Sequence, residues 1–133
     1  MKEAGFLGPR AYMRDMLRLV AIRLKIPDNE AYTALTALRR LGVEADRLER
    51  ADLVWLQPGQ EPDFNPNKHV VSELADENPR EGEVWIEDAD FPGEAVAWRL
   101  LLADGTPAPP ATVRAAADLL LCNPAIEKAR FHR

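Results

Sequence analysis

The stretch VAWRLLLADGTPAPPATVRAAADLLLCNPAIEKARF, residues Val96–Phe131, decides the fold of this chain. Apolar residues occupy every second position from Val96 to Leu102, which is the alternation typical of a strand. The run Asp104–Pro107 then predicts a turn, because glycine permits a positive φ and proline cannot donate to a strand ladder.

A helix and a second strand are expected after this turn. Pro109 and Pro110 suit the first turn of a helix, where a missing N–H costs nothing. Asn123 can adopt the left-handed cap and Pro124 forbids further helix, so Ile126–Phe131 is expected to be a returning strand. The apolar residues of the helix share one face at i, i+3, i+4 and i+7: Val113, Ala116, Ala117 and Leu120.

The chain before this unit predicts a similar succession of elements. Leu17–Lys25 is expected to be a strand that is apolar on both faces and therefore needs cover on both sides. A helix follows, with Asp28 or Asn29 as its N-cap and Gly42 at its end. Residues 45–56 predict a second strand, bent near its middle.

Residues 57–82 are punctuated by prolines and glycines. A short helix that carries Val70, Val71 and Leu74 is expected there, capped by Asn67. The rest of this segment is expected to be loop, less ordered than the core and dispensable for folding. Residues 84–87 predict a short strand before the final unit.

The order of elements is thus β-α-β, an insertion with one strand, and β-α-β. This order predicts an α+β fold of the ferredoxin-like, split β-α-β type, a two-layer sandwich with an antiparallel sheet and both helices on one face. Residues 16–133 are expected to form this single domain, with an inserted segment at about 57–94. Residues 1–15 are charged throughout and are expected to be a mobile extension rather than a secretory signal; Met13 or Met16 could be the biological start.

Composition restricts the function classes. The 133 residues, 47% hydrophobic and 29% charged, are ordinary for one globular domain. A net charge of −5 gives no support to nucleic-acid binding, which requires a basic face. The single cysteine excludes an intramolecular disulfide and favours a reducing cytoplasm, and no apolar run is long enough to span a bilayer. We therefore expect a cytoplasmic protein without nucleic-acid or membrane partners.

The sequence predicts no catalytic, cofactor-binding or metal-binding residue. His69 and His132 have no partner at metal-ligand spacing, which favours two surface histidines. Cys122 lies near the end of an apolar helix and is expected to be a buried structural thiol. The acidic stretch from Glu87 to Glu94 lacks the spacing of a calcium loop and predicts a turn. We therefore expect no cofactor and no activity of the chain alone.

The three tryptophans fall on expected strands and allow two interpretations. The first is core packing; the second is a subunit interface, where tryptophan is enriched. The first strand favours an interface, because two helices can cover only one sheet face and the other would be an exposed apolar patch. A homodimer with facing sheets would bury that patch, unless the insertion folds back over it. The candidate interface residues are Leu19, Ala21, Trp55, Trp85 and Trp98.

The two ends of the chain resemble the PurS family, the small subunit of phosphoribosylformylglycinamidine synthase. The resemblance is carried by Leu100–Gly105, by the helix that stops at Asn123-Pro124, and by the strand Ile126–Phe131, in the family's order. The first strand and the Ala-Leu-rich helix that ends at Leu41-Gly42 are similar as well. Together these segments cover roughly two-thirds of the chain.

The resemblance implies a non-catalytic assembly subunit of purine biosynthesis that forms a homodimer or a higher homo-oligomer. In that family's complex, which uses ATP and glutamine-derived ammonia, the subunit brings a large synthetase subunit and a glutaminase subunit together. The chain departs from the family where Arg50-Ala51-Asp52 replaces a Gly-Lys pair, and residues 57–94 have no counterpart.

Two other functions stay open. One is a regulatory module of the ACT type that binds a small molecule; a Gly-rich turn after the first strand would favour it, and Ile26–Asn29 supplies none. The other is a small enzyme whose site lies in the insertion around His69 and Asp88.

Overall fold

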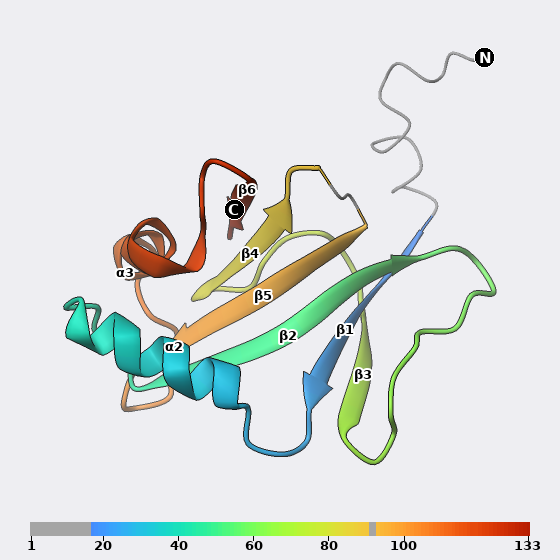
Figure 1. Ribbon diagram of the computed structural model, residues 1–133, viewed down its shortest axis with the longest axis horizontal. Helices are drawn as coiled ribbons and strands as arrows, with labels where there is room; N and C mark the ends of the chain where they lie inside the picture. The colour runs from blue at the N-terminus through green and yellow to red at the C-terminus, as the bar shows by residue number, and fades with distance from the viewer. Residues whose placement is uncertain (1–16, 91–92) are drawn as a thin grey trace.

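The computed structural model describes residues 17–90 and 93–133, so the expectations for residues 1–15 and for a start at Met13 or Met16 lie outside it. The described residues form an α+β fold, with one six-stranded sheet and two helical segments (Figure 1). No helix within these residues is long and apolar enough to cross a membrane. The elements are β1 (Arg18–Leu24), α2 (Asn29–Arg40), β2 (Arg47–Leu56), β3 (His69–Leu74), β4 (Glu83–Asp88), β5 (Glu94–Leu101), α3 (Pro110–Ala116), the π-helical turn η2 (Ala117–Leu121) and β6 (Glu127–Phe131).

The strands lie in the order β3-β1-β2-β5-β4-β6, and every neighbouring pair is antiparallel. The α+β class and the antiparallel sheet are therefore confirmed. The ferredoxin-like topology is not found, since a split β-α-β unit has a third strand between the two that its helix joins. Here β1 and β2 are direct neighbours, with Val20 opposite Val54.

The direction of α2 explains this difference. In Figure 1, α2 continues away from the end of β1 instead of running back beside it, so the next strand must return in the opposite direction. The ten residues of β2 exceed the seven of β1, and only the second half of β2 pairs with β1. The first half of β2 therefore extends beneath the helices.

The signals that begin and end α2 act as the sequence predicts. The Asp28 carboxylate accepts hydrogen bonds from the amides of Glu30 and Ala31, at 3.0 and 3.2 Å. Gly42 has a φ of 89° just after the helix, a conformation that glycine adopts without cost. These contacts satisfy backbone groups that a helix end leaves open.

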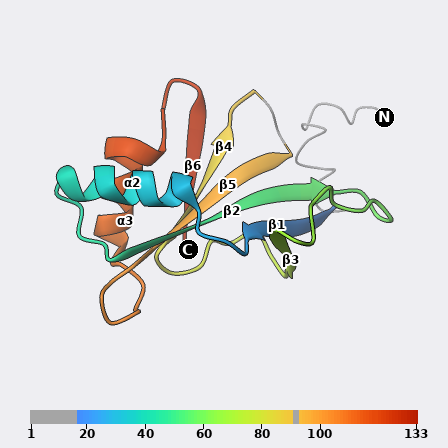
Figure 2. The ribbon, with the colours of Figure 1, turned by 60° about the horizontal axis from the view of Figure 1, so that its bottom comes forward.

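Both helices pack on one face of the sheet, as expected, and they lie together at one end of it (Figure 2). Leu38 of α2, Val84 of β4 and Leu100 of β5 have no exposed surface at all. The buried residues of this helix-side core are Leu38, Val43, Ala45, Leu48, Val84, Ile86, Leu100, Ala108, Val113, Ala116 and Ala117.

The second helix changes its winding before it ends. The segment Ala117–Leu121 is π-helical, and the amide of Cys122 donates to the carbonyl of Ala117 at 3.0 Å. This wider turn rotates the following side chains, so that Leu121 packs on the helix-side core and Leu120 is 41% exposed. The prediction that Leu120 lies on the buried face of the helix is therefore wrong.

The insertion contains a strand where a short helix was expected. Val70, Val71 and Leu74 belong to β3, which pairs with β1 over the whole of His69–Leu74. Adjacent valines favour a strand, because their branched side chains fit a pleated surface. The side chain of Asn67 caps no helix here. Residues 57–82 thus supply an edge strand of the sheet.

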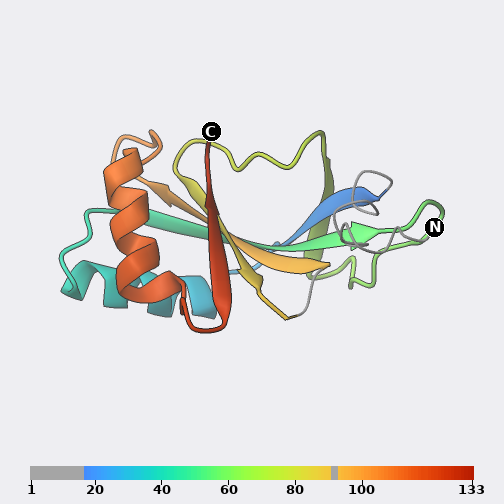
Figure 3. The same ribbon diagram turned by 90° about the horizontal axis from the view of Figure 1, so that it is seen from above.

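The connection from β3 to β4 crosses the second face of the sheet. Since β1, β2 and β5 lie between β3 and β4, the connection at residues 75–82 must pass over them, on the side away from α2 (Figure 3). Pro79 in this connection is less than 2% exposed. A second buried cluster lies on this face: Leu19, Ala21, Ala51, Leu53, Trp55, Trp85, Ala95 and Ala97. Residues 75–82, which belong to the segment expected to be dispensable, therefore pack against the core.

Candidate ligand-binding pocket

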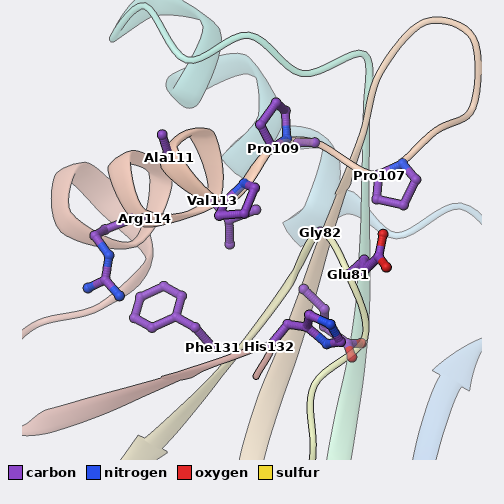
Figure 4. Close-up of a pocket in the computed structure, with 12 residues that line it drawn as sticks. Glu81, Gly82, Pro107, Pro109, Ala111, Val113, Arg114, Phe131 and His132 are labelled. Carbon is purple, nitrogen blue, oxygen red and sulfur yellow. The ribbon is translucent and has the colours of Figure 1, made fainter.

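A pocket of about 680 Å³ lies where the start of α3 meets the end of β6 and the chain before β4 (Figure 4). This volume falls within the range of small-molecule sites. The lining residues are Glu81, Gly82, Glu83, Pro107, Ala108, Pro109, Pro110, Ala111, Val113, Arg114, Phe131 and His132.

The turn after β5 builds one wall. The Asp104 carboxylate accepts hydrogen bonds from the Thr106 hydroxyl at 2.6 Å and the Thr106 amide at 3.0 Å, which lower the pKa of Asp104. The amide of Leu102 donates to the carbonyl of Thr106 at 2.8 Å, and Pro107 forms a bridge with Leu101. The chain therefore folds back along β5 and presents its prolines to the pocket.

Gly82 lies in the opposite wall, directly against Pro107. Its carbonyl accepts from the amide of Leu100 at 2.8 Å, and its φ is +80°. A Cβ at this position would lie 2.8 Å from Cβ of Pro107 and 2.9 Å from the carbonyl oxygen of Leu100. Glycine is therefore needed here for both conformation and space.

Arg114 supplies the positive charge of the pocket. Its guanidinium stands 4.2 Å from the centroid of the Phe131 ring, a cation–π contact that holds it at the pocket's edge (Figure 4). No carboxylate among residues 17–90 and 93–133 forms an ion pair with it. Its hydrogen-bond donors are therefore available to an anion.

His132 supplies a polar group of fixed tautomer. Its Nδ1 lies 2.7 Å from the carbonyl oxygen of Pro79. A carbonyl can only accept, so Nδ1 carries the hydrogen, and in the neutral ring Nε2 is an acceptor. The buried carboxylate of Glu83 is held by the amide and the guanidinium of Arg80, at 2.8 and 3.1 Å. His132 is exposed, as the sequence predicts. No motif in the sequence indicates this pocket.

The candidate interface residues do not form one surface. Leu19, Ala21, Trp55 and Trp85 belong to the buried cluster on the second face, with exposures of 5%, 7%, 6% and 1%. Trp98 lies on the opposite face, partly buried and 5.7 Å from the guanidinium of Arg50. For the first four residues the core-packing interpretation holds, because alternation puts their side chains under the crossing connection.

A polar network that the sequence did not predict fixes the connection. Glu77 accepts hydrogen bonds from the indole N–H of Trp55 at 3.0 Å and from Arg130 at 3.0 Å. Arg130 also pairs with the buried carboxylate of Glu87 at 3.4 Å. These partners lie 22 and 53 positions from Glu77, beyond the reach of any local pattern.

The proposed enzyme site in the insertion is not assembled. His69 starts β3 and Asp88 ends β4, and three strands separate these two elements in the sheet. The Nδ1 of His69 accepts from the amide of Asn65, and Asp88 accepts from the amide of Asp90, as in ordinary turns. No group of metal-ligating side chains is found in the described residues.

Cys122 has the character of a structural thiol. Its partial burial raises the pKa of the thiol, and the nearby charges of Glu127 and Asp118 raise it further. A raised pKa keeps the sulfur protonated and disfavours a nucleophilic role.

Comparison of the chain with protein-family models, with curated proteins and with solved structures finds no match.

Replacement of Gly82 by alanine should destabilise the protein more than the same change at Gly59. Both glycines have φ near +80°, yet nothing lies within 4 Å of a Cβ at Gly59. Gly59→Ala should cost about 1 kcal/mol for the left-handed conformation, and Gly82→Ala about 2–4 kcal/mol because overpacking is added. Urea denaturation measures both, and equal losses would show that the two walls do not touch as described.

Proposed function

We propose that this chain is a non-catalytic small-molecule-binding module whose pocket takes a compact apolar molecule bearing a carboxylate. The observation that carries the proposal is Arg114, which stands without an acidic partner from the described chain at the edge of an apolar pocket of about 680 Å³. Binding sites of this kind combine apolar walls with a few convergent polar groups.

The walls suit an apolar body. Pro107 and Pro109 present rigid rings, the buried Val113 lies near Pro109, and Phe131 lies beside Arg114 (Figure 4). Prolines lose little conformational entropy when a ligand orders its surroundings, so apolar contact with them costs little. A flat aromatic or branched aliphatic group fits this lining.

The carboxylate is assigned to Arg114 because a guanidinium presents paired donors that match the two oxygens of a carboxylate. The contact with Phe131 orients the guanidinium plane in advance, which reduces the entropy lost on binding. In the neutral ring, Nε2 of His132 is an acceptor for a hydroxyl or amine of the ligand.

Phenylacetate and hexanoate are suitable probes, with phenylacetamide and hexanamide as neutral analogues of nearly equal shape. Titration calorimetry should show that the carboxylates bind the wild-type chain at least tenfold more tightly than the amides. Arg114→Gln should abolish this preference, because it removes the charge. Arg40→Gln, an exposed change in the last turn of α2, should leave it intact.

Two results would contradict the proposal: no binding of any carboxylate at millimolar concentration, or equal binding of acid and amide by the wild-type chain. An unchanged preference in Arg114→Gln would also contradict it.

We propose as a second candidate a cytoplasmic assembly role like that of PurS, in which the chain forms a homodimer and connects a large synthetase subunit with a glutaminase. The resemblance at the chain ends supports it, and so does an open groove of about 490 Å³ between α2 and η2. Trp98, one of the candidate interface residues, lies in this groove, and the exposed Leu120 forms its rim. In a two-fold dimer each copy could place Leu120 in the partner's groove.

Light scattering at micromolar concentration tests this second candidate. Leu119 and Leu120 are 53% and 41% exposed, but only Leu120 lines the groove. The wild-type chain and Leu119→Glu should therefore be dimers, and Leu120→Glu a monomer. A monomeric wild-type chain would contradict the assembly role and leave the ligand-binding proposal standing.

A further inference from the structure

The helices cover only part of the face on which they pack. Both lie at one end of the sheet (Figures 1 and 2), over the rows that contain Leu48 and Leu100. The next rows along the strands form an open groove of about 430 Å³. Strand register places four side chains of this groove in one row across the sheet: Ile22, Asp52, Val96 and Ile86.

The groove has an apolar floor and an acidic rim. Ile22, Val54 and Val96 are partly exposed in it. By contrast, Leu48 and Leu100 lie on the same face under the helices and are buried. Five carboxylates line the groove: Asp52, Asp63, Asp88, Glu94 and Glu127. Apolar surface and uniform negative charge therefore occur together.

Most of this charge is not neutralised within the described chain. Asp52 pairs with Arg50 at 3.3 Å, whereas no ion pair joins the other four carboxylates to any lysine or arginine of residues 17–90 and 93–133. Within residues 17–90 and 93–133, Asp88 and Glu127 accept hydrogen bonds only from backbone amides in their own turns. Four like charges around one groove favour a cationic occupant.

We infer that this groove is the docking surface for an amphipathic helix of a partner protein, with an apolar stripe flanked by lysine or arginine. The helical form follows from the face itself, because α2 and α3 already form a layer on it and a third helix would complete that layer. The basic flanks follow from charge complementarity with the rim.

A metal ion or a nucleic acid does not fit this groove. No cluster of ligating side chains suited to a metal occurs in the described residues, and a hydrated cation would leave the apolar floor exposed. A nucleic acid would be repelled by the carboxylates. The groove shares no residue with the ligand-binding pocket, so the two proposals can fail independently.

A synthetic 18-residue peptide of leucine, alanine and lysine, with its leucines on one helical face, is the probe. A scrambled peptide of equal composition and a version with glutamate for lysine are its controls. Fluorescence anisotropy in 150 mM salt measures the affinity of each peptide for the full chain. The ordered basic peptide should bind at least tenfold more tightly than either control.

The matched variants locate the site. The triple variant Asp88→Asn, Glu94→Gln and Glu127→Gln removes three rim charges and keeps the acceptor oxygens. It should bind the ordered peptide at least tenfold more weakly than the wild type. A control that removes three charges near the start of β2, Glu44→Gln, Asp46→Asn and Glu49→Gln, should bind within twofold of the wild type.

Equal binding by the two triple variants, or by the ordered and scrambled peptides, would overturn the inference, since only general charge attraction would remain. Light scattering that gives the triple rim variant a lower molar mass than the wild-type chain would overturn it too. The occupant of the groove would then be a second copy of this chain.

Discussion

The carboxylate of Glu77 joins parts of the chain that are distant in both sequence and sheet order. It accepts hydrogen bonds from Trp55 on β2 and from Arg130 on β6, and so fixes the connection between β3 and β4 across the second sheet face. Hydrogen bonds to charged groups are stronger than neutral ones and are costly to break when partly buried. The contacts of Glu77 therefore hold residues 75–82 over the second face of the sheet.

Several other features follow from this closure. Trp55 and Trp85, whose rings meet edge to face at 6.4 Å, become core residues of a single chain. The connection also places the carbonyl of Pro79 beside His132 and brings Gly82 against Pro107. The segment that covers the second face therefore also builds one side of the ligand-binding pocket.

The local elements could largely be predicted from the sequence. The Asp28 side chain caps the start of α2, Gly42 with its positive φ follows the end of this helix, and the alternation after Val96 predicts β5. Short-range rules apply there because each signal acts within about one turn of helix or along one strand. These rules did not predict the π-helical turn, because no residue type in the sequence marks it. This turn shifts Leu120 to the surface.

The strand order and the site could not be predicted in the same way. The pattern β-α-β is compatible with a crossover or with adjacent strands, and only the path of α2 past the end of β1 decides between them. Val70 and Val71 pair with β1 because an edge was open to them, which is a property of the sheet and not of the segment. The pocket joins residues more than 45 positions apart in the chain, such as Glu81 and Phe131. No local sequence motif can therefore predict it.

Hydrogen exchange measured by NMR on the full chain tests whether the connection at residues 75–82 is a fixed part of the core. The indole N–H of Trp55, bound to Glu77, and the amide of Arg80, bound to Glu83, report on it directly. Both should exchange as slowly as the backbone amides of β2 and β5, within about tenfold, because they open only with the core. Exchange of both at the rate of a free loop, while β2 and β5 stay protected, would contradict it.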